Sequence, residues 1–374
     1  MSTKPKAKNP SPSQQIALVL QGGGALGAYQ AGVHEVLLNQ GNRIDWVIGT
    51  SIGAINAAII AGNPPAKQAE KLKEFWDIVS SESVGGYSAP WLQSWMGQSQ
   101  VMKTITQGIP GFFVPRSVWA WDINLPVSTA QTSFYDTSPL KETLLKVVDF
   151  DYLNSGTTRC SVCAVSVASS ELTIFDNAKE PLTPEHIMAS GALPPGFAPV
   201  VINKVAYWDG GIYSNSPIEV VLNDSLTKDT LCYMIDLWDP TVEEPRSIAQ
   251  AMARLKDIQY ASRSKEHLIA HKKLQDLRCA IELLAAQLPA TALKNTAVQK
   301  AVALGDSHSI NIVRLIMKAL TSDDQSKDID FSRAAIEARW QAGCQDAKRA
   351  LLHKQWLKPL QEGVGMAIHE LEQE

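Results

Sequence analysis

The sequence predicts an α/β protein in which helices cover a parallel β-sheet. Residues 16–20 form a short apolar run closed by glycines, which is typical of a buried parallel strand. A glycine-rich turn follows over residues 22–27, and residues 28–38 then show apolar side chains at helical spacing. A second apolar run begins at residues 45–48 and leads into a second helix, rich in small side chains, over residues 50–61. Strand, turn and helix therefore occur twice in succession, which is the pattern of a helix-covered parallel sheet.

The remainder of the chain predicts more strands and then a helical part. Further β-like runs are found at residues 161–167, 172–175, 205–208 and 230–235. Helical patterns follow at residues 247–288 and 331–357, and residues 310–316 between them predict a late edge strand. We therefore expect a flexible tail over residues 1–15, an α/β domain over 16–240 with an aromatic-rich insertion at about 80–133, and a mainly helical C-terminal extension over 241–374.

Composition excludes several classes of protein. With 45% hydrophobic and 19% charged residues among 374, the chain is typical of globular rather than disordered proteins. A net charge of -4 argues against a dedicated nucleic-acid binder. No run approaches the ~20 apolar residues that a membrane span needs, and residues 1–15 lack the apolar segment of a signal peptide. The five scattered cysteines suggest free thiols in a reducing compartment, so we expect a cytoplasmic protein.

The glycine turn has two interpretations. Gly22, Gly24 and Gly27 fit the G-x-G-x-x-G pattern of a dinucleotide-binding turn. That interpretation needs an acidic residue at the carboxyl end of the second strand, whereas Asp45 precedes the apolar run. The alternative is an oxyanion hole, because backbone N–H groups at a glycine turn and helix start can hold a developing negative oxygen. This alternative, which we favour, requires a nearby nucleophile.

A candidate nucleophile stands at the next predicted turn. Gly49, Ser51 and Gly53 form a G-x-S-x-G pattern between the second strand and the second helix. A sharp strand–turn–helix connection needs small residues two before and two after the serine, and it exposes the hydroxyl at the edge of the sheet. A serine that only caps the helix is the plain structural alternative.

The base that would activate this serine is predicted to be a carboxylate. The seven histidines lie in polar helical runs, in a short helix or in a turn, where solvent exposure is the simpler interpretation. Asp209 ends a β-like run and is followed by Gly210 and Gly211. Asp-Gly-Gly is also an ordinary turn sequence. Because sites form at the carboxyl edge of a parallel sheet, Asp209 and Ser51 are expected to meet there. A carboxylate withdrawn from water has a raised pKa and can serve as a general base.

These three motifs, in this order, resemble those of the patatin-like phospholipase family. Residues 189–194 (ASGALP) and 197–200 (FAPV) resemble the segment that precedes Asp-Gly-Gly in the family. The resemblance implies a three-layer α/β/α sandwich with a mostly parallel central sheet, and makes residues 16–240 the catalytic domain. It also implies a Ser–Asp dyad that hydrolyses acyl esters of lipids without a metal or an organic cofactor. The C-terminal extension resembles one found in a bacterial subgroup of the family.

Carried over by position, the resemblance assigns a role to each motif. Ser51 is the nucleophile, Asp209 is the general base, and the N–H groups of Gly22, Gly23 and Gly24 form the oxyanion hole, with Gly27, Gly49, Gly53, Gly210 and Gly211 supporting the turns. One position departs from the family. Many members carry Arg or Lys before the last glycine of the turn, where this chain has Leu26.

Three other features of the sequence bear on function. The insertion holds Trp91, Trp95, Phe112, Phe113, Trp119 and Trp121, which form either a packed subdomain or a lid and acyl-chain groove that touches a membrane surface. The helix over residues 246–278 is locally basic through Arg254, Lys256, Arg263, Lys265, Lys272, Lys273 and Arg278, which form either a solvated face or a contact with anionic head groups. Cys160-x-x-Cys163 lies on a predicted strand whose geometry points the two thiols to opposite faces, against a metal site.

The expected function is lipid acyl hydrolysis by a cytoplasmic protein with peripheral membrane contact and a lipid or phospholipid ester as substrate. An acyltransferase with the same dyad and a non-catalytic lipid-binding protein are the alternatives. No nucleic-acid partner is expected. The head group, the acyl length, the ester position and the oligomeric state are left open.

Overall fold

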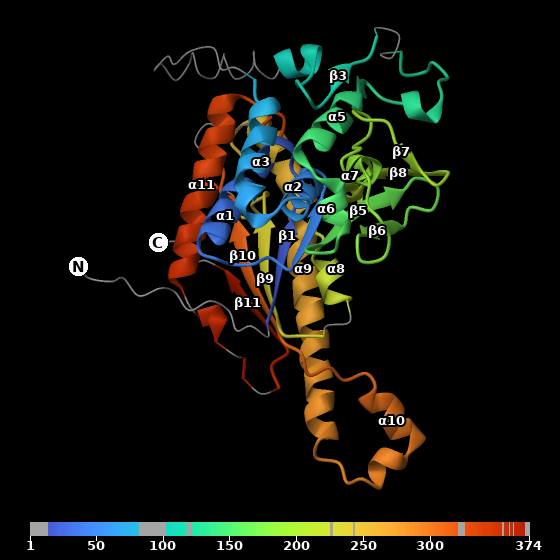
Figure 1. Ribbon diagram of the computed structural model, residues 1–374, viewed down its shortest axis with the longest axis vertical. Helices are drawn as coiled ribbons and strands as arrows, with labels where there is room; N and C mark the ends of the chain where they lie inside the picture. The colour runs from blue at the N-terminus through green and yellow to red at the C-terminus, as the bar shows by residue number, and fades with distance from the viewer. Residues whose placement is uncertain are drawn as a thin grey trace, which may run out of the picture.

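A computed structural model describes residues 14–81, 102–117, 122–224, 227–241, 244–320, 326–353, 355–358, 360–361 and 363–370, without the side chains of 262–265 and 355. Its centre is a nine-stranded sheet in the order β11-β10-β9-β1-β2-β5-β8-β7, with β6 paired to β5 (Figure 1). The strands are β1 (Gln15–Leu20), β2 (Trp46–Thr50), β5 (Arg159–Ser166), β6 (Leu172–Asp176), β7 (Val200–Ile202), β8 (Val205–Asp209), β9 (Thr230–Asp236), β10 (Ile310–Ile316) and β11 (Met366–Glu370).

The sheet is parallel from β11 to β5 and antiparallel at β6, β8 and β7. A separate two-stranded sheet pairs β3 (Val114–Pro115) with β4 (Tyr135–Asp136). The helices are α1 (Ala28–Asn39), α2 (Ile52–Ala61), α3 (Pro65–Ile78), α5 (Ser138–Val147), α6 (Phe150–Asn154), α7 (Pro184–Ser190), α8 (Ile218–Leu222), α9 (Ile248–Ala285), α10 (Thr296–Val302) and α11 (Arg333–Leu352).

Two hydrophobic cores, one on each face of the sheet, make the fold a three-layer sandwich. Leu18 and Leu20 of β1 belong to the core shared with α1, α2, α3 and α11, whereas Ala17 and Val19 belong to the core shared with α8 and α9. This alternation follows from the period of two in a strand, with both faces buried by helices. The predicted fold class is confirmed.

The C-terminal extension contributes to the same sheet. β10 pairs with β9, and β11 pairs with β10. The prediction that residues 310–316 form an edge strand was wrong, since β10 is an inner strand and β11 forms the edge. The side chains of β10 are buried along almost its whole length, as expected for an inner parallel strand. β11 was not predicted from the sequence.

Helix α11 packs closely on α1. A Cβ atom on Gly343 would collide with the backbone carbonyl of Tyr29, and one on Gly32 would collide with that of Trp340, so glycines permit the close crossing. The Tyr29 hydroxyl donates a hydrogen bond to Asp346 at 2.8 Å. Residues from the two ends of the chain therefore share one helix layer.

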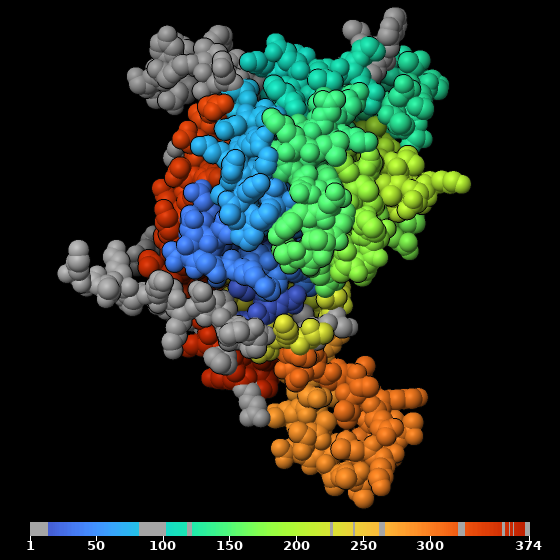
Figure 2. Space-filling view, in the orientation of Figure 1, coloured from blue at the N-terminus to red at the C-terminus, as the bar shows by residue number. Residues whose placement is uncertain are grey.

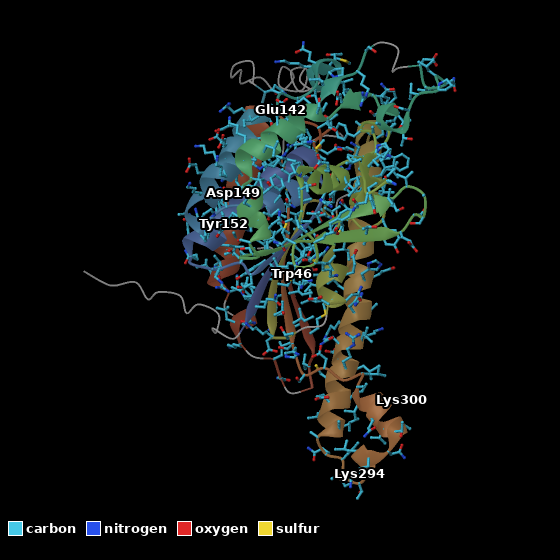
Figure 3. All side chains as sticks on the ribbon, turned by 45° about the vertical axis from the view of Figure 1, so that its right-hand side comes forward. Trp46, Glu142, Asp149, Tyr152, Lys294 and Lys300 are labelled. Atoms are coloured by element: carbon cyan, nitrogen blue, oxygen red, sulfur yellow. The ribbon has the colours of Figure 1, made fainter. Side chains whose placement is uncertain are left out.

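Helix α9 is much longer than the sheet it covers. Its C-terminal end and α10 form a projection from the rest of the protein (Figures 1 and 2). Lys294 and Lys300 lie at the far end of this projection (Figure 3). The described part of the aromatic-rich insertion lies at the opposite end of the molecule (Figure 1). Among the described residues, no helix combines the length and apolar character required to cross a membrane.

Candidate active site

Ser51 occupies the sharp turn between β2 and α2. Its backbone angles are φ 57° and ψ -126°, a conformation that non-glycine residues rarely adopt and that often marks a functional site. The two flanking glycines have no room for a side chain. A Cβ atom on Gly49 would collide with the carbonyl of Gly53, and one on Gly53 would collide with the carbonyl of Leu20. The predicted nucleophile elbow is therefore formed, and it projects Ser51 from the sheet.

Asp209 ends β8 and lies beside Ser51. The carboxylate is only 2% exposed and accepts a hydrogen bond from the Gly211 N–H at 2.7 Å. It also accepts a hydrogen bond from the side chain of Ser51. Burial raises the pKa of Asp209 to about 7, although both hydrogen bonds act in the opposite direction. The carboxylate is thus poised to exchange a proton with a hydroxyl near neutral pH.

One segment at the end of α7 holds both residues. The Ser51 N–H donates to the hydroxyl and to the carbonyl of Ser190, each at 3.1 Å. The Ser190 hydroxyl in turn donates to the carbonyl of Cys163 at 2.6 Å. The Asp209 N–H donates to the carbonyl of Ala192 at 3.0 Å. Residues 190–192, singled out by their resemblance to a family segment, thereby fix the spacing between hydroxyl and carboxylate.

Gly22 does not offer its amide to the site. Its N–H donates to the carbonyl of Asn215 at 3.1 Å, and its own carbonyl accepts from the Asn215 side chain at 3.0 Å and from the Trp238 indole at 2.8 Å. The prediction that Gly22 contributes an oxyanion N–H was therefore wrong. A side chain is nevertheless excluded, because a Cβ atom here would collide with the Asn215 side chain.

The N–H groups of Gly23 and Gly24 remain as candidate donors of the oxyanion hole. Both line the cavity in front of Ser51, and neither N–H has a hydrogen-bond acceptor among the described residues. Gly24 has φ 55°, a left-handed conformation that favours glycine. Two unpaired N–H groups beside a serine hydroxyl match the donors of an oxyanion hole.

Buried polar side chains support the glycine turn, and these residues were not predicted from the sequence. The side-chain oxygen of Gln21 accepts the backbone N–H groups of Leu237 and Trp238, and its amide group donates to the carbonyl of Tyr260. Asn215 and Trp238 also bind the turn, as described above. No local pattern marks these residues, because each contact joins segments far apart in the sequence.

Leu26 and Gly27 face the core rather than the cavity. Leu26 is fully buried in the hydrophobic core on the helix side of the turn. A Cβ atom on Gly27 would crowd Ile52 and Trp76. A basic side chain at position 26 would thus enter an apolar layer in this protein.

An apolar cavity of about 340 Å³ opens in front of Ser51 and Asp209. Described residues of the insertion form part of its wall, with Phe113 ring centroids 4.9 Å from Tyr135 and 5.2 Å from Phe197. The predicted Trp91, Trp95, Trp119 and Trp121 lie outside the described residues. The apolar lining of the cavity comprises Ile52, Ile55, Ile105, Phe112, Phe113, Tyr135, Leu193, Phe197, Trp238, Tyr260, Ile329 and Phe331.

The other predicted features lie away from this cavity. Cys160 and Cys163 belong to the cores on opposite faces of the sheet, as predicted, and burial raises the pKa of both thiols. Among the described residues that line the cavity there is no histidine.

Part of the basic face of α9 is engaged within the chain. Arg254 donates to two backbone carbonyls, and Lys256 and Lys272 pair with carboxylates. The structure does not describe the side chains of Arg263 and Lys265.

Comparison with known proteins supports a family assignment. The family model described as Patatin-like phospholipase matches residues 18–222, and a model described as Patatin phospholipase matches residues 258–363. A patatin-like phospholipase domain-containing protein of Caenorhabditis elegans is 39% identical over 61 residues, a match that spans 16% of this chain and 6% of that protein.

Solved structures give more distant similarity. VipD from Legionella pneumophila is 16% identical with a TM-score of 0.40, and the match covers 91% of this chain and 67% of that one. ExoU–SpcU from the type III secretion system of Pseudomonas aeruginosa is 17% identical with a TM-score of 0.28, covering 78% of this chain and 57% of that one. The match to residues 18–222 spans the glycine turn, the nucleophile elbow and Asp209. The chain therefore belongs to the patatin-like phospholipase family, a family of lipid acyl hydrolases.

Proposed function

We propose that this protein is a serine acyl hydrolase that cleaves lipid esters with a Ser51–Asp209 dyad. The observation that carries the proposal is the hydrogen bond from the Ser51 side chain to a buried carboxylate whose pKa is about 7. Serine is a weak nucleophile until a base accepts its proton. A carboxylate with an ordinary pKa would be a poor base at neutral pH, whereas one with a pKa near 7 is well matched to the task.

In the first half of the reaction, Asp209 accepts the Ser51 hydroxyl proton as Ser51 Oγ attacks the ester carbonyl. The oxyanion that forms is stabilised by the N–H groups of Gly23 and Gly24. Collapse of the tetrahedral intermediate breaks the bond to the alcohol, which leaves with the proton from Asp209. The acyl group stays on Ser51 as an ester.

In the second half, water replaces the alcohol. Asp209 accepts a proton from the water molecule as its oxygen attacks the acyl-enzyme carbonyl, and the same two amides stabilise the second oxyanion. Ser51 then leaves with the proton from Asp209, and the fatty acid is released. Each half returns the carboxylate to its starting state, so no further base is needed.

The shape and chemistry of the cavity favour an acyl chain as the bound group. A cavity of about 340 Å³ lined mainly by aromatic and aliphatic side chains lies within the range of small-molecule sites. Exposed apolar side chains on the insertion, including Met102, Ile123, Leu125 and Val127, suit a peripheral contact with a membrane surface. We propose that the protein acts in the cytoplasm at such a surface.

Turnover of a lipid panel tests the proposal. Fatty-acid release is measured from phospholipids, lysophospholipids and neutral esters with the wild type, Ser51→Ala and Asp209→Asn. The proposal requires release by the wild type and near-complete loss in both variants, each checked for folding by circular dichroism. Acyl transfer to an added alcohol in preference to water would instead identify a transferase. Lipid binding by a folded wild type without any turnover would identify a lipid-binding protein.

A further inference from the structure

We propose that the C-terminal extension completes the active site with a strap, residues 326–332, which positions the oxyanion amides and closes one wall of the acyl cavity. This inference rests on the proposed function. It is carried by contacts between the strap and the glycine turn, by ion pairs that fix the strap, and by two strap side chains that line the cavity.

The strap touches the glycine turn through the backbone of Asp328. The Asp328 carbonyl accepts the N–H of Ala25 at 2.8 Å. It also fills the space beside Gly24, where a Cβ atom would collide with the same oxygen. The Asp328 carbonyl therefore fixes the Gly24–Ala25 peptide directly and limits the rotation of the preceding peptide, which carries the Gly24 N–H. Neither the Gly23 nor the Gly24 N–H has an acceptor among the described residues.

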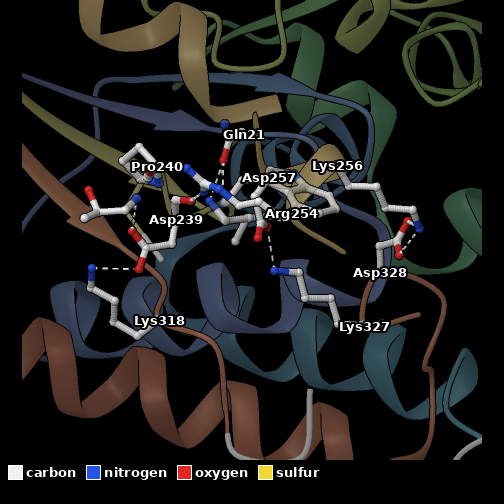
Figure 4. Close-up of polar contacts among 12 residues, drawn as sticks. Gln21, Asp239, Pro240, Arg254, Lys256, Asp257, Lys318, Lys327 and Asp328 are labelled. Atoms are coloured by element: carbon white, nitrogen blue, oxygen red, sulfur yellow. Dashed lines mark hydrogen bonds and ion pairs between the residues drawn. The ribbon is translucent and has the colours of Figure 1, made fainter. Parts of the chain in front are cut away.

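Ion pairs to α9 fix this end of the strap (Figure 4). Lys256 Nζ lies 2.7 Å and 3.0 Å from the two carboxylate oxygens of Asp328. Lys327 Nζ lies 2.7 Å from the carboxylate of Asp257. Both pairs join the strap to consecutive residues of one helix, and they hold Asp328 and the residue before it beside the glycine turn.

Lys327 also links the strap to Trp238, which supports the glycine turn. Its ammonium group lies 5.1 Å from the centroid of the Trp238 ring, a cation–π distance. The indole N–H of Trp238 donates to the carbonyl of Gly22 at 2.8 Å. The strap therefore contacts the glycine turn directly at Gly24 and Ala25 and indirectly at Gly22.

The other end of the strap is fixed to the segment that follows α3. The Ser81 N–H donates to the carbonyl of Phe331 at 2.9 Å, and the Arg333 N–H donates to the carbonyl of Ser81 at 3.0 Å. The Phe331 ring stacks on Trp76 at 6.4 Å between centroids and lies 5.9 Å from Phe112. Phe331 and Ile329 line the cavity. The extension therefore supplies part of the surface that an acyl chain would contact.

The Lys256–Asp328 pair allows the strap to be loosened without unfolding the protein. Its side chains are 37% and 21% exposed, and ion pairs of this kind add little to stability. The Lys327–Asp257 pair is 9% and 6% exposed, so removing one partner would leave a buried charge. The first pair is therefore the one to test. Asp328 is a positioning residue, because it acts on the oxyanion through the glycine turn.

The experiment compares Lys256→Met with Lys318→Met. Lys318 is a matched control, because it pairs with Asp239 at 2.7 Å, comes from the same extension and does not contact the glycine turn (Figure 4). We expect Lys256→Met to lower kcat for a soluble short-chain ester about 10- to 100-fold with KM within about twofold, since misplaced oxyanion donors weaken only the transition state. The rate of fluorophosphonate labelling should fall in parallel. Lys318→Met should match the wild type.

Rescue variants separate positioning from a general loss of structure. Lys256→Arg should keep the ion pair and most of kcat, and the exchange Lys256→Asp with Asp328→Lys should recover part of the loss. Wild-type kcat in Lys256→Met, an equal loss in Lys318→Met, or an equal loss in Lys256→Arg would overturn the inference. If Lys256→Met fails to fold, the inference is tested with the Lys256→Arg and exchange variants alone, by whether each keeps or recovers kcat as stated above. Failure of the proposed function gives a different result, because the wild type itself would then neither turn over esters nor react with the fluorophosphonate. In that case this inference would also be overturned.

Discussion

The side chain of Ser51 is hydrogen-bonded to Asp209, and the backbones of both residues bind one segment. Ser51 donates to Ser190, Asp209 donates to Ala192, and the carboxylate itself is almost completely buried. Burial raises the pKa of Asp209, and the hydrogen bonds from Ser51 and Gly211 limit that rise. The geometry is therefore that of a serine with a base in place, rather than of a serine that only caps a helix.

The pH dependence of catalysis follows from this carboxylate. Asp209 must be ionised to accept the Ser51 proton, so kcat/KM should rise with pH through an apparent pKa of about 7 and level off above it. A pH–rate profile of the wild type measures this value. A plateau that extends unchanged down to pH 5 would contradict the assignment of Asp209 as the base.

Stability should depend on pH in the opposite direction. The pKa of Asp209 in the folded protein, about 7, lies above its ordinary value of 3.8, so the folded state binds the proton more tightly than the unfolded state. The contribution of Asp209 to stability is therefore fully present below pH 4 and is lost as pH rises toward 7. Asp209→Asn removes this loss, and its Tm relative to the wild type should be higher at pH 8 than at pH 5. Thermal unfolding at both pH values checks this, and equal differences would contradict it.

Ser190→Ala tests the segment that joins the two residues. The variant removes one of the two acceptors of the Ser51 N–H and leaves the Cys163 carbonyl without a hydroxyl donor. We expect a loss of about 1–3 kcal/mol in the free energy of unfolding, the cost of an unsatisfied buried polar group. A displaced elbow should also lower kcat about tenfold or more. Urea unfolding and ester turnover measure the two effects. Full activity would show that the hydroxyl is not needed to position Ser51.

Phe113→Leu tests the acyl cavity. Phe113 packs against Tyr135 and Phe197 in the wall, and a smaller side chain should enlarge the space available to the substrate. We expect the preference among p-nitrophenyl esters to shift toward longer acyl chains. Phe175→Leu is a matched control, because Phe175 is also buried but packs against His186 and Tyr207. The same shift in both variants would argue against an acyl chain in this cavity.

Short-range patterns predicted the parts of the site that a few neighbouring residues determine. The G-x-S-x-G elbow could be predicted because steric crowding at Gly49 and Gly53 is a local requirement. Asp209 could be predicted because Asp-Gly-Gly ends a β-like run, but the reason for its meeting with Ser51 was different from the one expected. β8 runs antiparallel to β5, so Asp209 pairs with Ala164, beside the residue that pairs with Thr50, and does not lie at a carboxyl edge shared by parallel strands. The fold class followed from two successive strand–turn–helix units.

Contacts between distant segments could not be predicted in this way. The engagement of the Gly22 amide depends on Asn215, and the orientation of Gly24 depends on Asp328. Nothing in the local sequence of the glycine turn reports either partner. The inner position of β10 was missed for a similar reason, since it depends on the pairing of β10 with both β9 and β11, which no local pattern reports.

Active-site labelling tests the central claim most directly. The protein is treated with a fluorophosphonate, digested, and mapped by mass spectrometry, with Ser51→Ala and Asp209→Asn as folded comparisons. The dyad predicts a single adduct on Ser51 in the wild type, none in Ser51→Ala, and much slower labelling in Asp209→Asn. An adduct on another serine, or a folded wild type that never reacts, would contradict it.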